Sequence, residues 1–411
     1  MTAKKNVLVL NCGSSSLKFA LIDSQSGATS LSGLAERLGS NEASIKIKFN
    51  LTSKQAKLER SLSESKDQGL AHAAAIQALV DVLTQENLHS QIAAIGHRVV
   101  HGGEAFTQST LIDNAVLESI RAVSDLAPLH NPANLVGIDA AMNAFPDLPQ
   151  VAVFDTAFHQ SMPEKAYLYA IDLDLYKKWG LRKYGFHGTS HYYVSQEAAR
   201  LLNIPSQDFS AITVHLGNGC SICAVENGQS VDTSLGMTPV AGLVMGTRSG
   251  DIDPGLLIYL MRQKGYSADD VDELLNKKSG LLGLSKLSND CRTLEEALDG
   301  RDSELKQRAQ LALEVFSYRV AKYIASYTCA LSHLDALIFT GGIGENSSYI
   351  RQHVIEQLSL MGITLDKDAN LAARFGQGGV IQGTDSRFKV LVVPTNEELV
   401  IAQDAARLAI G

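Results

Sequence analysis

The sequence is short of long hydrophobic runs and of cysteine, and both shortages exclude classes of protein. No apolar run approaches the roughly 18 residues that a membrane-spanning helix needs, so no membrane partner is expected. The start, Met1 to Asn6, is a short basic lead into an apolar segment rather than a signal peptide, which favours a cytoplasmic location. The few cysteines are odd in number and scattered, which fits a reducing compartment without a disulfide framework. They are Cys12, Cys220, Cys223, Cys291 and Cys329.

An excess of positive charge is also missing. The formal net charge is −8 and no strong basic patch is found, so a nucleic-acid partner is not expected. Apolar residues make up 45% of the chain and charged residues 19%, which is typical of a folded protein. At 411 residues the chain exceeds the size at which a single core keeps growing, and this length predicts two domains.

Several familiar site signatures are absent as well. Neither the Walker loop G-x-x-x-x-G-K-[ST] nor the Rossmann fingerprint occurs. His187 and His191 have the spacing of metal ligands, but Gly188 between them weakens a helix and no H-E-x-x-H is present, so zinc is not expected. Cys220 and Cys223 form a C-x-x-C in a predicted strand, where their odd spacing sends the side chains to opposite faces. We interpret them as small buried residues rather than as a metal or redox pair.

The stretch from Val7 to Asp23 is an apolar strand, a tight turn of glycine and serine, and a returning strand. Glycine lets backbone N–H groups approach an anion, serine hydroxyls donate further hydrogen bonds, and Lys18 adds charge. The turn therefore suits a phosphate group, although an ordinary hairpin with a polar turn has the same pattern. A partial repeat follows, in which Leu10 to Gly13 aligns with Val214 to Gly217. The repeat indicates either a duplicated domain with a second phosphate turn or a chance likeness between two hairpins.

Charged residues mark the ends of other predicted strands. Arg98 ends a strand before paired glycines, and Arg248 lies in a glycine-rich loop. Each could form an ordinary salt bridge, but together with phosphate-type turns they suit the spread-out charge of a transferring phosphoryl group. Asp155 ends a buried strand, where a carboxylate is costly unless it is paired or functional. A third glycine-rich turn, at Gly341, follows the predicted strand from Ala336 to Thr340 and could pack against a nucleoside.

Taken together, these stretches resemble the acetate kinase family over essentially the whole chain. The motifs that carry the resemblance are long, specific and in the family's order: Asn11 to Lys18, Gly96 to Gly103, Ala127 to Pro132, Phe154 to His159, Tyr184 to His191, His215 to Gly219, Val231 to Pro254, Ser279 to Arg292, Phe339 to Asn346 and Pro394 to Asp404. The family belongs to the sugar-kinase/heat-shock/actin superfamily. The resemblance therefore implies an α/β fold of two duplicated ribonuclease-H-like domains, each a mixed sheet flanked by helices, with a cleft between them.

The activity implied by the resemblance is reversible transfer of the γ-phosphoryl group of ATP to acetate, giving acetyl phosphate and ADP. The implied cofactor is Mg²⁺, with Mn²⁺ as a substitute. The residues that match the family's catalytic positions are Asp155, His187, Arg248 and Arg98. Those that match its acyl-group pocket are Arg98, Val100, Leu129, Phe186 and Pro239. The magnesium-associated positions are Asn11 and Glu397.

The nucleotide-binding positions are matched by residues from several segments of the sequence: Lys18, Ser14, Ser16, His215, Leu216, Gly217, Asn218, Gly219, Asp290, Cys291, Arg292, Gly342, Ile343, Gly344, Glu345 and Asn346. The family resemblance also implies a homodimer. We expect residues 1–155 and 390–411 to form one domain, and residues 156–389 to form a second domain with most nucleotide contacts and the dimer interface. The alternatives are a kinase that prefers propionate or another short acid, and a non-catalytic ATP-gated binding module. Against the binding module, all four catalytic positions are occupied.

Overall fold

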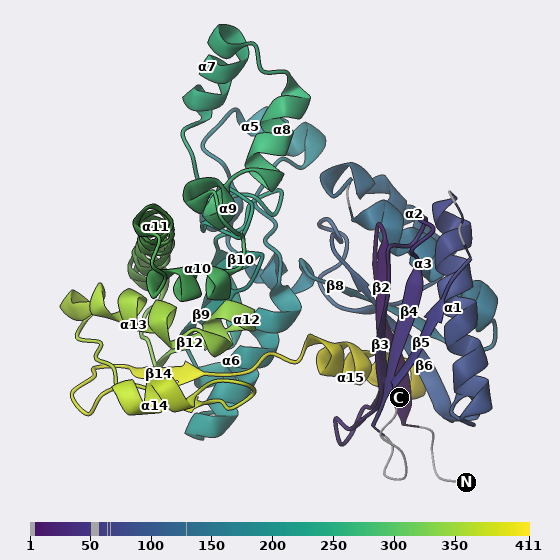
Figure 1. Ribbon diagram of the computed structural model, residues 1–411. Coiled ribbons are helices and arrows are strands. Elements are labelled where there is room, and N and C mark those ends of the chain that lie inside the picture. The colour runs from purple at the N-terminus through teal and green to yellow at the C-terminus, as the bar shows by residue number, and fades with distance from the viewer. Residues whose placement is uncertain (1–4, 51–56, 64, 66, 129) are drawn as a thin grey trace. The chain divides into compact units, whose positions relative to one another are not determined.

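A computed structural model describes residues 5–50, 57–63, 65, 67–128 and 130–411 (Figure 1). The chain divides into two compact units, unit 1 with residues Met1–Ala157 and Asn396–Gly411, and unit 2 with residues Phe158–Thr395. The expected first domain resumed at residue 390, but the strand at Lys389–Val392 pairs in parallel with Ala336–Thr340 in the sheet of unit 2. Residues 390–395 therefore belong to the second unit, because this strand completes its sheet.

Unit 1 is built on an eight-stranded sheet in the order β5-β4-β3-β2-β1-β6-β8-β7. Strands β1 to β5 form an antiparallel meander, and β6 and β8 continue the sheet in parallel with β1. The strands are β1 (Asn6–Gly13), β2 (Ser16–Asp23), β3 (Thr29–Glu36), β4 (Ser44–Phe49), β5 (Lys57–Ser61), β6 (Ile92–Val99), β7 (Thr110–Leu111) and β8 (Gln150–Phe154). The helices are α1 (Gln68–Gln85), α2 (Asn114–Ala122), α3 (Asn131–Ala144) and α15 (Glu397–Ile410), with short turns η1 (His89–Gln91) and η2 (Ser124–Leu126).

Both faces of this sheet are buried, because successive side chains of a strand point to opposite sides. On one face, Leu8 and Leu10 of β1 pack in a core with α1 and α3. On the other face, Val7 and Val9 of the same strand pack in a core with Ile401 and its neighbours on α15. The near-continuous apolar run of β1 follows from this double burial. The β1–β2 turn lies where these two inner strands of the sheet end.

Unit 2 has a six-stranded sheet in the order β11-β10-β9-β12-β14-β13. Its strands are β9 (Ala211–Leu216), β10 (Cys220–Glu226), β11 (Gln229–Thr233), β12 (Ala336–Thr340), β13 (Gly379–Val380) and β14 (Lys389–Val392). Its helices are α4 (Glu164–Tyr167), α5 (Leu173–Trp179), α6 (Gly188–Leu202), α7 (Pro254–Lys264), α8 (Ala268–Lys277), α9 (Gly280–Ser285), α10 (Cys291–Leu298), α11 (Ser303–Tyr327), α12 (Gly341–Asn346), α13 (Ser348–Glu356) and α14 (Lys367–Ala372). Single turns are η3 (Ala157–Ser161), η4 (Ser206–Asp208), η5 (Thr328–Ala330) and η6 (Ser359–Met361).

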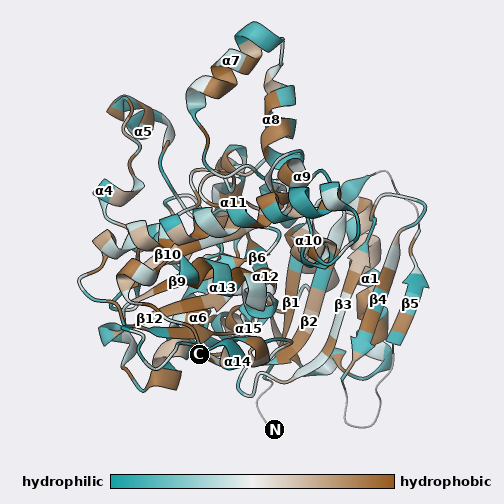
Figure 2. Cartoon of the chain, turned by 60° about the vertical axis from the view of Figure 1, so that its left-hand side comes forward, coloured by the Kyte–Doolittle hydropathy of each residue, from teal (hydrophilic) through white to brown (hydrophobic). Residues whose placement is uncertain are grey.

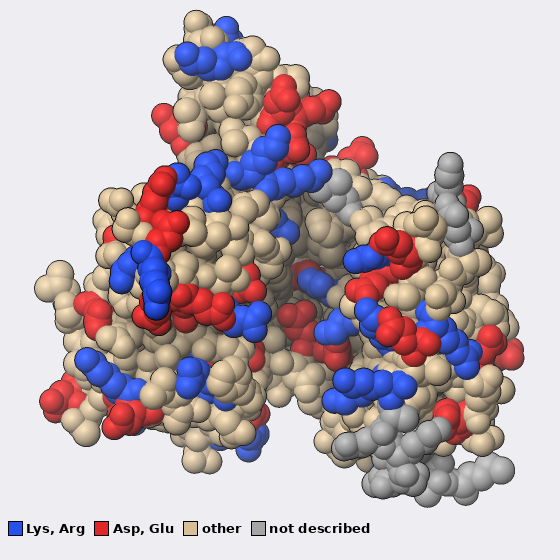
Figure 3. Space-filling view, in the orientation of Figure 1, with Lys and Arg blue, Asp and Glu red and all other residues tan. Residues whose placement is uncertain are grey.

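Apolar strands form the centre of this unit as well, as the hydropathy colours of Figure 2 show for β9, β10 and β12. Val194 and Ala198 of α6 pack with Ile338 of β12 and Leu391 of β14 in one buried core. Acidic and basic side chains are interspersed on the face of the molecule seen in Figure 3.

The two sheets share one strand order. In unit 1 the six strands from β3 to the edge strand β7 run β3-β2-β1-β6-β8-β7, and in unit 2 the corresponding order is β11-β10-β9-β12-β14-β13. In both, an antiparallel hairpin is followed by two parallel strands and a short antiparallel edge strand. The repeated turns of the sequence are the equivalent hairpins β1–β2 and β9–β10. This match supports duplication rather than chance likeness.

Candidate active site

Arg98 and Asp155 form a buried ion pair in unit 1. They lie at the same edge of the sheet, because Arg98 is the last residue but one of β6 and Asp155 follows β8, its parallel neighbour. The guanidinium donates Nε–H to one carboxylate oxygen of Asp155 at 2.9 Å and Nη2–H to the other at 2.7 Å. The Asp155 side chain is 2% exposed and that of Arg98 is 24% exposed. The carboxylate raises the pKa of Arg98, so the arginine is firmly charged.

Glu397, the first residue of α15, acts on the same pair. It is half-buried, and desolvation raises its pKa, with the charge of Arg98 opposing that shift. Asn11 of β1 is also half-buried. Within the described part of the chain no group of three or more His, Cys, Asp or Glu residues could hold a metal ion. One carboxylate and one amide oxygen nevertheless fit Mg²⁺, which kinases bind through one or two carboxylates, waters and the substrate phosphates.

The first phosphate-type turn is held from α1. Gly13 pairs with Ser16 across the hairpin, and the two serines between them lie in the turn. The imidazole Nε2 of His72 lies 2.9 Å from the carbonyl oxygen of Gly13, and Gln68 donates to the carbonyl of Ser14 at 2.6 Å. These contacts position the turn although neither side chain belongs to it, and no motif in the sequence reveals them.

Lys18 lies next to Asn11 in the hairpin register and pairs with Glu398 at 2.7 Å. The lysine side chain is 62% exposed, so the pair contributes less than about 1 kcal/mol and Lys18 can exchange this partner for a phosphate. The structure therefore places Asn11, Ser14, Ser16 and Lys18 on one hairpin, β1–β2, as the sequence predicts.

Two asparagines of α3 hold the segment that follows Arg98. Asn134 accepts from the backbone N–H of Val100 at 3.0 Å and donates to the carbonyl of Cys12 at 2.7 Å. Asn131 accepts from the backbone N–H of His101 at 3.1 Å. Asn134 thus ties β1 to the segment after β6, and Asn131 holds the backbone of that segment; sequence reasoning missed both positioning groups. Val100 is 8% exposed, and Leu129, its predicted companion, lies outside the described residues.

The turn of the second hairpin, β9–β10, lies beside the catalytic candidates of unit 2, His187 and Arg248. His187 precedes α6 with a φ of 57°, a left-handed conformation that is rare for a residue with a side chain. Its ring stacks on that of His215, with centroids 4.4 Å apart. A Cβ built on Gly219 would lie 3.4 Å from His187 Nε2 and 3.5 Å from Arg248 Nη1. His187 and Arg248, which are distant in sequence, thus meet at the turn.

Arg248 is half-buried, and desolvation lowers its pKa. Its Nη1–H donates to the carbonyl of Pro239 at 3.0 Å, which brings one predicted acyl-pocket residue beside the arginine. Phe186, a second, is 2% exposed. Its carbonyl oxygen lies 3.0 Å from His159 Nε2, and this contact supports the backbone next to His187.

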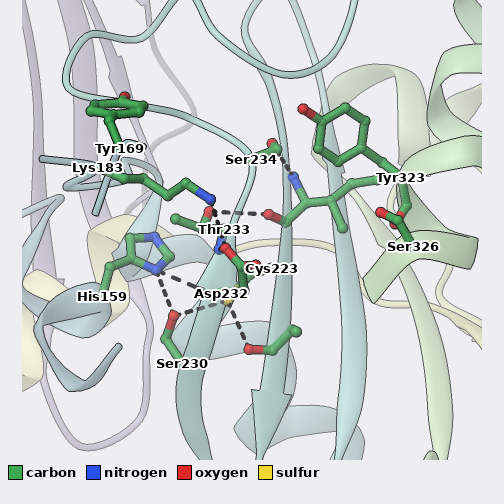
Figure 4. Close-up of polar contacts among 12 residues, drawn as sticks. His159, Tyr169, Lys183, Cys223, Ser230, Asp232, Thr233, Ser234, Tyr323 and Ser326 are labelled. Carbon is green, nitrogen blue, oxygen red and sulfur yellow. Dashed lines mark hydrogen bonds and ion pairs between the residues drawn. The ribbon is translucent and has the colours of Figure 1, made fainter. Parts of the chain in front are cut away.

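His159 belongs to a buried polar cluster on β10 and β11 (Figure 4). Its Nδ1 lies 2.8 Å from the hydroxyl of Ser230, and that hydroxyl lies 3.2 Å from Cys223 Sγ. Burial raises the pKa of the Cys223 thiol to about 12, and that of Cys220 likewise. Both cysteines are fully buried, which confirms their interpretation as small core residues, and a thiol of such high pKa is a poor redox group or metal ligand.

A pocket of about 450 Å³ in unit 2 collects most of the predicted nucleotide-binding segments. Predicted residues that line it are Gly217, Asn218, Asp290, Cys291, Arg292, Gly342, Ile343 and Asn346. The predicted residues of unit 2 that do not line it are His215, Leu216, Gly219, Gly344 and Glu345, and the predicted residues Ser14, Ser16 and Lys18 belong to unit 1. Glu345 instead accepts from the backbone N–H groups of Gly341 and Thr395, each at 3.0 Å, so it holds the β12–α12 turn.

Sequence reasoning missed part of the pocket wall. Asn289, Glu295, Ser347, Arg374 and Phe375 also line it. The Phe375 side chain is 79% exposed, and its backbone N–H donates to Asn346 at 2.9 Å. Its φ of 55° turns the chain back toward α12. A large exposed aromatic ring at a pocket mouth offers a stacking surface for a base, but no glycine-rich or charged motif marks this loop in the sequence.

The shared strand order of the two units, each a mixed sheet flanked by helices, defines an α/β protein of the actin-like ATPase type and confirms the predicted fold class. Solved structures agree. A propionate kinase of Francisella tularensis matches with a TM-score of 0.91 and 45% identity, covering 98% of this chain and 100% of its own. An acetate kinase of Porphyromonas gingivalis matches with a TM-score of 0.90 and 42% identity, covering 98% and 99%.

The chain belongs to the acetokinase family, whose model matches residues 6–403. Among curated proteins, "Acetate kinase 1" of Vibrio cholerae is 54% identical over 407 residues, which are 98% of this chain and 99% of that protein. An acetate kinase of Shewanella sp. strain ANA-3 is 54% identical over 409 residues, or 99% of each chain. The family resemblance predicted from the motifs is thereby confirmed. No helix among the described residues is long and apolar enough to cross a membrane.

Proposed function

We propose that this protein is an acetate kinase, which transfers the γ-phosphoryl group of ATP reversibly to acetate and forms acetyl phosphate and ADP. The observation that carries the proposal is the 54% identity, over nearly the whole length, to proteins named acetate kinase. The candidate site supports it, because both units present charged groups suited to phosphoryl transfer at equivalent edges of their sheets. We also propose a cytoplasmic location.

Transfer of a phosphoryl group to a carboxylate does not need a strong general base. A carboxylic acid with a pKa of about 4–5 is already ionised at neutral pH, so the acceptor is a ready nucleophile. The obstacle is the repulsion between an anionic acceptor and an anionic phosphoryl group. Arg98, Arg248 and His187 are the groups that would offset this charge and hold an in-line geometry.

Asp155 acts in this proposal as a positioning group rather than as a proton acceptor. Both of its carboxylate oxygens accept hydrogen bonds from Arg98, which fixes the plane of the guanidinium. A carboxylate engaged in this way has little freedom to take a proton from a substrate, and acetate has none to give. Its contribution is therefore the orientation of Arg98 toward the acyl phosphate.

Mg²⁺, with Mn²⁺ as a substitute, would be held by Glu397 and Asn11 together with substrate phosphates. When bound, the ion would neutralise phosphate charge. The raised pKa of Glu397 fits a carboxylate that gains from a cation. The nucleotide would occupy the pocket between the β9–β10 turn and α12, with the base near Phe375 and the phosphates toward Gly217.

The acyl group would lie against Val100, Phe186 and Pro239. Propionate is the alternative substrate, because a propionate kinase is 45% identical to this chain and one methylene is worth only roughly 1–3 kcal/mol of discrimination. A non-catalytic ATP-gated binding module is the other alternative. It would have no use for the two arginines, Arg98 and Arg248, or for the left-handed His187.

We propose a homodimer formed through unit 2. All described residues of α7 are exposed or half-buried, and among them are the large apolar side chains Leu256, Ile258, Tyr259 and Met261. Trp179, at the end of α5, is 64% exposed. Apolar side chains in such number on an external helix are typical of a protein interface. A sedimentation measurement that finds one chain per particle at micromolar concentration would contradict the dimer.

Acyl-phosphate formation tests the activity. Purified protein with Mg-ATP and acetate, propionate or butyrate is trapped with hydroxylamine, and the hydroxamate is measured by colour. Acetate should give the highest kcat/KM. A higher value for propionate would favour the alternative kinase, and no product with any acid would refute the enzyme. Arg248→Lys is the matched variant, because it keeps one positive charge and loses the planar fork, and its kcat should fall by at least roughly tenfold.

A further inference from the structure

A chain of side-chain hydrogen bonds runs from the core of unit 2 to His187. The hydroxyl of Ser221 on β10 lies 2.8 Å from His187 Nδ1 and 2.7 Å from His191 Nε2. The other nitrogen of His191, Nδ1, lies 2.7 Å from the hydroxyl of Thr213 on β9. Thr213, Ser221 and His191 are each 0% exposed, so water does not compete for these contacts.

The far end of this chain sets its direction. Thr213 Oγ1 also lies 3.4 Å from the carbonyl oxygen of Cys223, which can only accept, so Thr213 can donate its one hydroxyl proton there. In that arrangement Thr213 accepts from His191 Nδ1–H at 2.7 Å. Desolvation lowers the pKa of His191 well below its ordinary value, so this ring is neutral and its Nε2 carries a lone pair.

Each remaining bond follows in turn. The lone pair on His191 Nε2 requires the hydroxyl proton of Ser221, because a neutral imidazole has one donor and one acceptor nitrogen. Ser221 Oγ is then left to accept from His187 Nδ1–H. In this arrangement the direction of three successive bonds follows from the donation of the Thr213 hydroxyl to one backbone carbonyl of β10.

We propose that Thr213, His191 and Ser221 form a positioning relay that fixes the tautomer of His187 with its proton on Nδ1. The effect of this relay on catalysis rests on the proposed phosphoryl transfer, but the tautomer of His187 is a property of the folded chain alone. With Nδ1 protonated, Nε2 presents an N–H only when His187 takes a second proton. His187 therefore donates to the phosphoryl oxygens as a charged imidazolium, and its neutral form would present a lone pair to them.

Ionisable groups approach His187 from the elements packed around it. His215 of β9 stacks on its ring, and Arg248 lies beside the same turn at Gly219. His191 of α6 acts through Ser221. Two neighbours of positive or potentially positive charge disfavour the imidazolium, whereas the anionic substrates favour it. The relay thus predicts that kcat for phosphoryl transfer falls as pH rises through the titration of His187.

Thr213→Val tests the relay, with Thr213→Ser as its matched control. Thr213 is separated from the His187 ring by His191 and Ser221, so the change does not touch the reacting atoms. Valine has the shape of threonine and suits a buried strand, but it cannot accept from His191 Nδ1–H. The change of lowest free energy is then for His191 to carry its proton on Nε2. This reverses the hydrogen bonds from His191 to Ser221 and from Ser221 to His187, and it leaves His187 with its proton on Nε2. The neutral His187 then donates an N–H, so the alkaline fall in kcat should shrink by roughly tenfold. Serine keeps the hydroxyl and should keep the original pH profile.

Nitrogen-15 NMR of histidine-labelled protein reads the tautomers without any turnover. The relay predicts Nδ1–H for His187 in the original chain and in Thr213→Ser, and Nε2–H in Thr213→Val. If Thr213→Val fails to fold, Ser221→Ala replaces it and should also release His187 to the Nε2–H form. An Nε2–H signal for His187 in the original chain would overturn the inference, as would identical tautomers in all variants. Absence of activity with every acid would refute the proposed function. The relay would still be tested, because the NMR measurement of the tautomers does not depend on activity.

Discussion

Replacing Arg98 by leucine should destabilise unit 1 as well as abolish phosphoryl transfer. The change removes both donors of the bidentate pair and leaves the carboxylate of Asp155 charged, 2% exposed and without its arginine. Breaking a buried pair from one side costs about 3–5 kcal/mol. The quarter-exposed arginine lets some water reach the carboxylate, so we expect the lower end, about 3 kcal/mol.

Urea unfolding followed by circular dichroism measures this cost, and a double-variant cycle isolates the charge. Arg98→Leu should unfold at clearly lower urea, whereas Arg98→Leu combined with Asp155→Asn should recover about half or more of the loss, because asparagine keeps the volume and removes the charge. Arg98→Lys is the control for charge without the fork. If Arg98→Leu unfolds within about 0.5 kcal/mol of the original chain, or if the two changes are additive, the pair is not the buried, coupled contact described above.

Two further predictions concern stability. Burial lowers the pKa of His97 and of His101 to about 4. Between this value and pH 6.5, the two imidazoles bind protons in the unfolded chain but stay neutral in the native chain. The free energy of unfolding should therefore fall from pH 6.5 toward pH 4, by roughly 2–3 kcal/mol for each ring, and urea midpoints that stay level across this range would contradict it. Gly137→Ala should lower the free energy of unfolding by about 1–3 kcal/mol, measured by thermal unfolding, because a Cβ there would lie 2.0 Å from Cys12 Sγ. The loss should be smaller in the Cys12→Ala background, and an equal loss in both backgrounds would argue against this contact.

The sequence predicted the fold because its strongest signals are local. The hairpin from Val7 to Asp23 and the apolar strand from Ala336 to Thr340 lie where the patterns place them. Local patterns failed where tertiary contacts decide. Strand β5 pairs with β4 through an alternation of charged and other residues, and no apolar run marks it in the sequence.

The candidate site was predictable in its reacting groups and not in its supports. Arg98 and Asp155 stand out because charge at the end of a buried strand is unusual, and Arg248 stands out because it lies in a glycine-rich loop. The residues that hold them do not. Asn134 and Ser221 are ordinary polar residues, and only the three-dimensional structure brings an amide of α3 to β1 or a hydroxyl of β10 between two histidines. Phe375 is a comparable case, because its place beside Asn346 depends on a left-handed backbone.

The division of unit 1 into two sequence segments has a consequence for synthesis on the ribosome. Residues 158–395 are continuous and can complete unit 2 as soon as they emerge. Unit 1 begins first but must wait for α15, whose Ile401, Ala402 and Ala405 cover Val7 and Val9 from the opposite end of the sequence. Until then one face of its sheet lacks its covering helix, a state prone to aggregation. The half of the molecule made first is thus the half finished last, and chaperone demand during translation should concentrate on it.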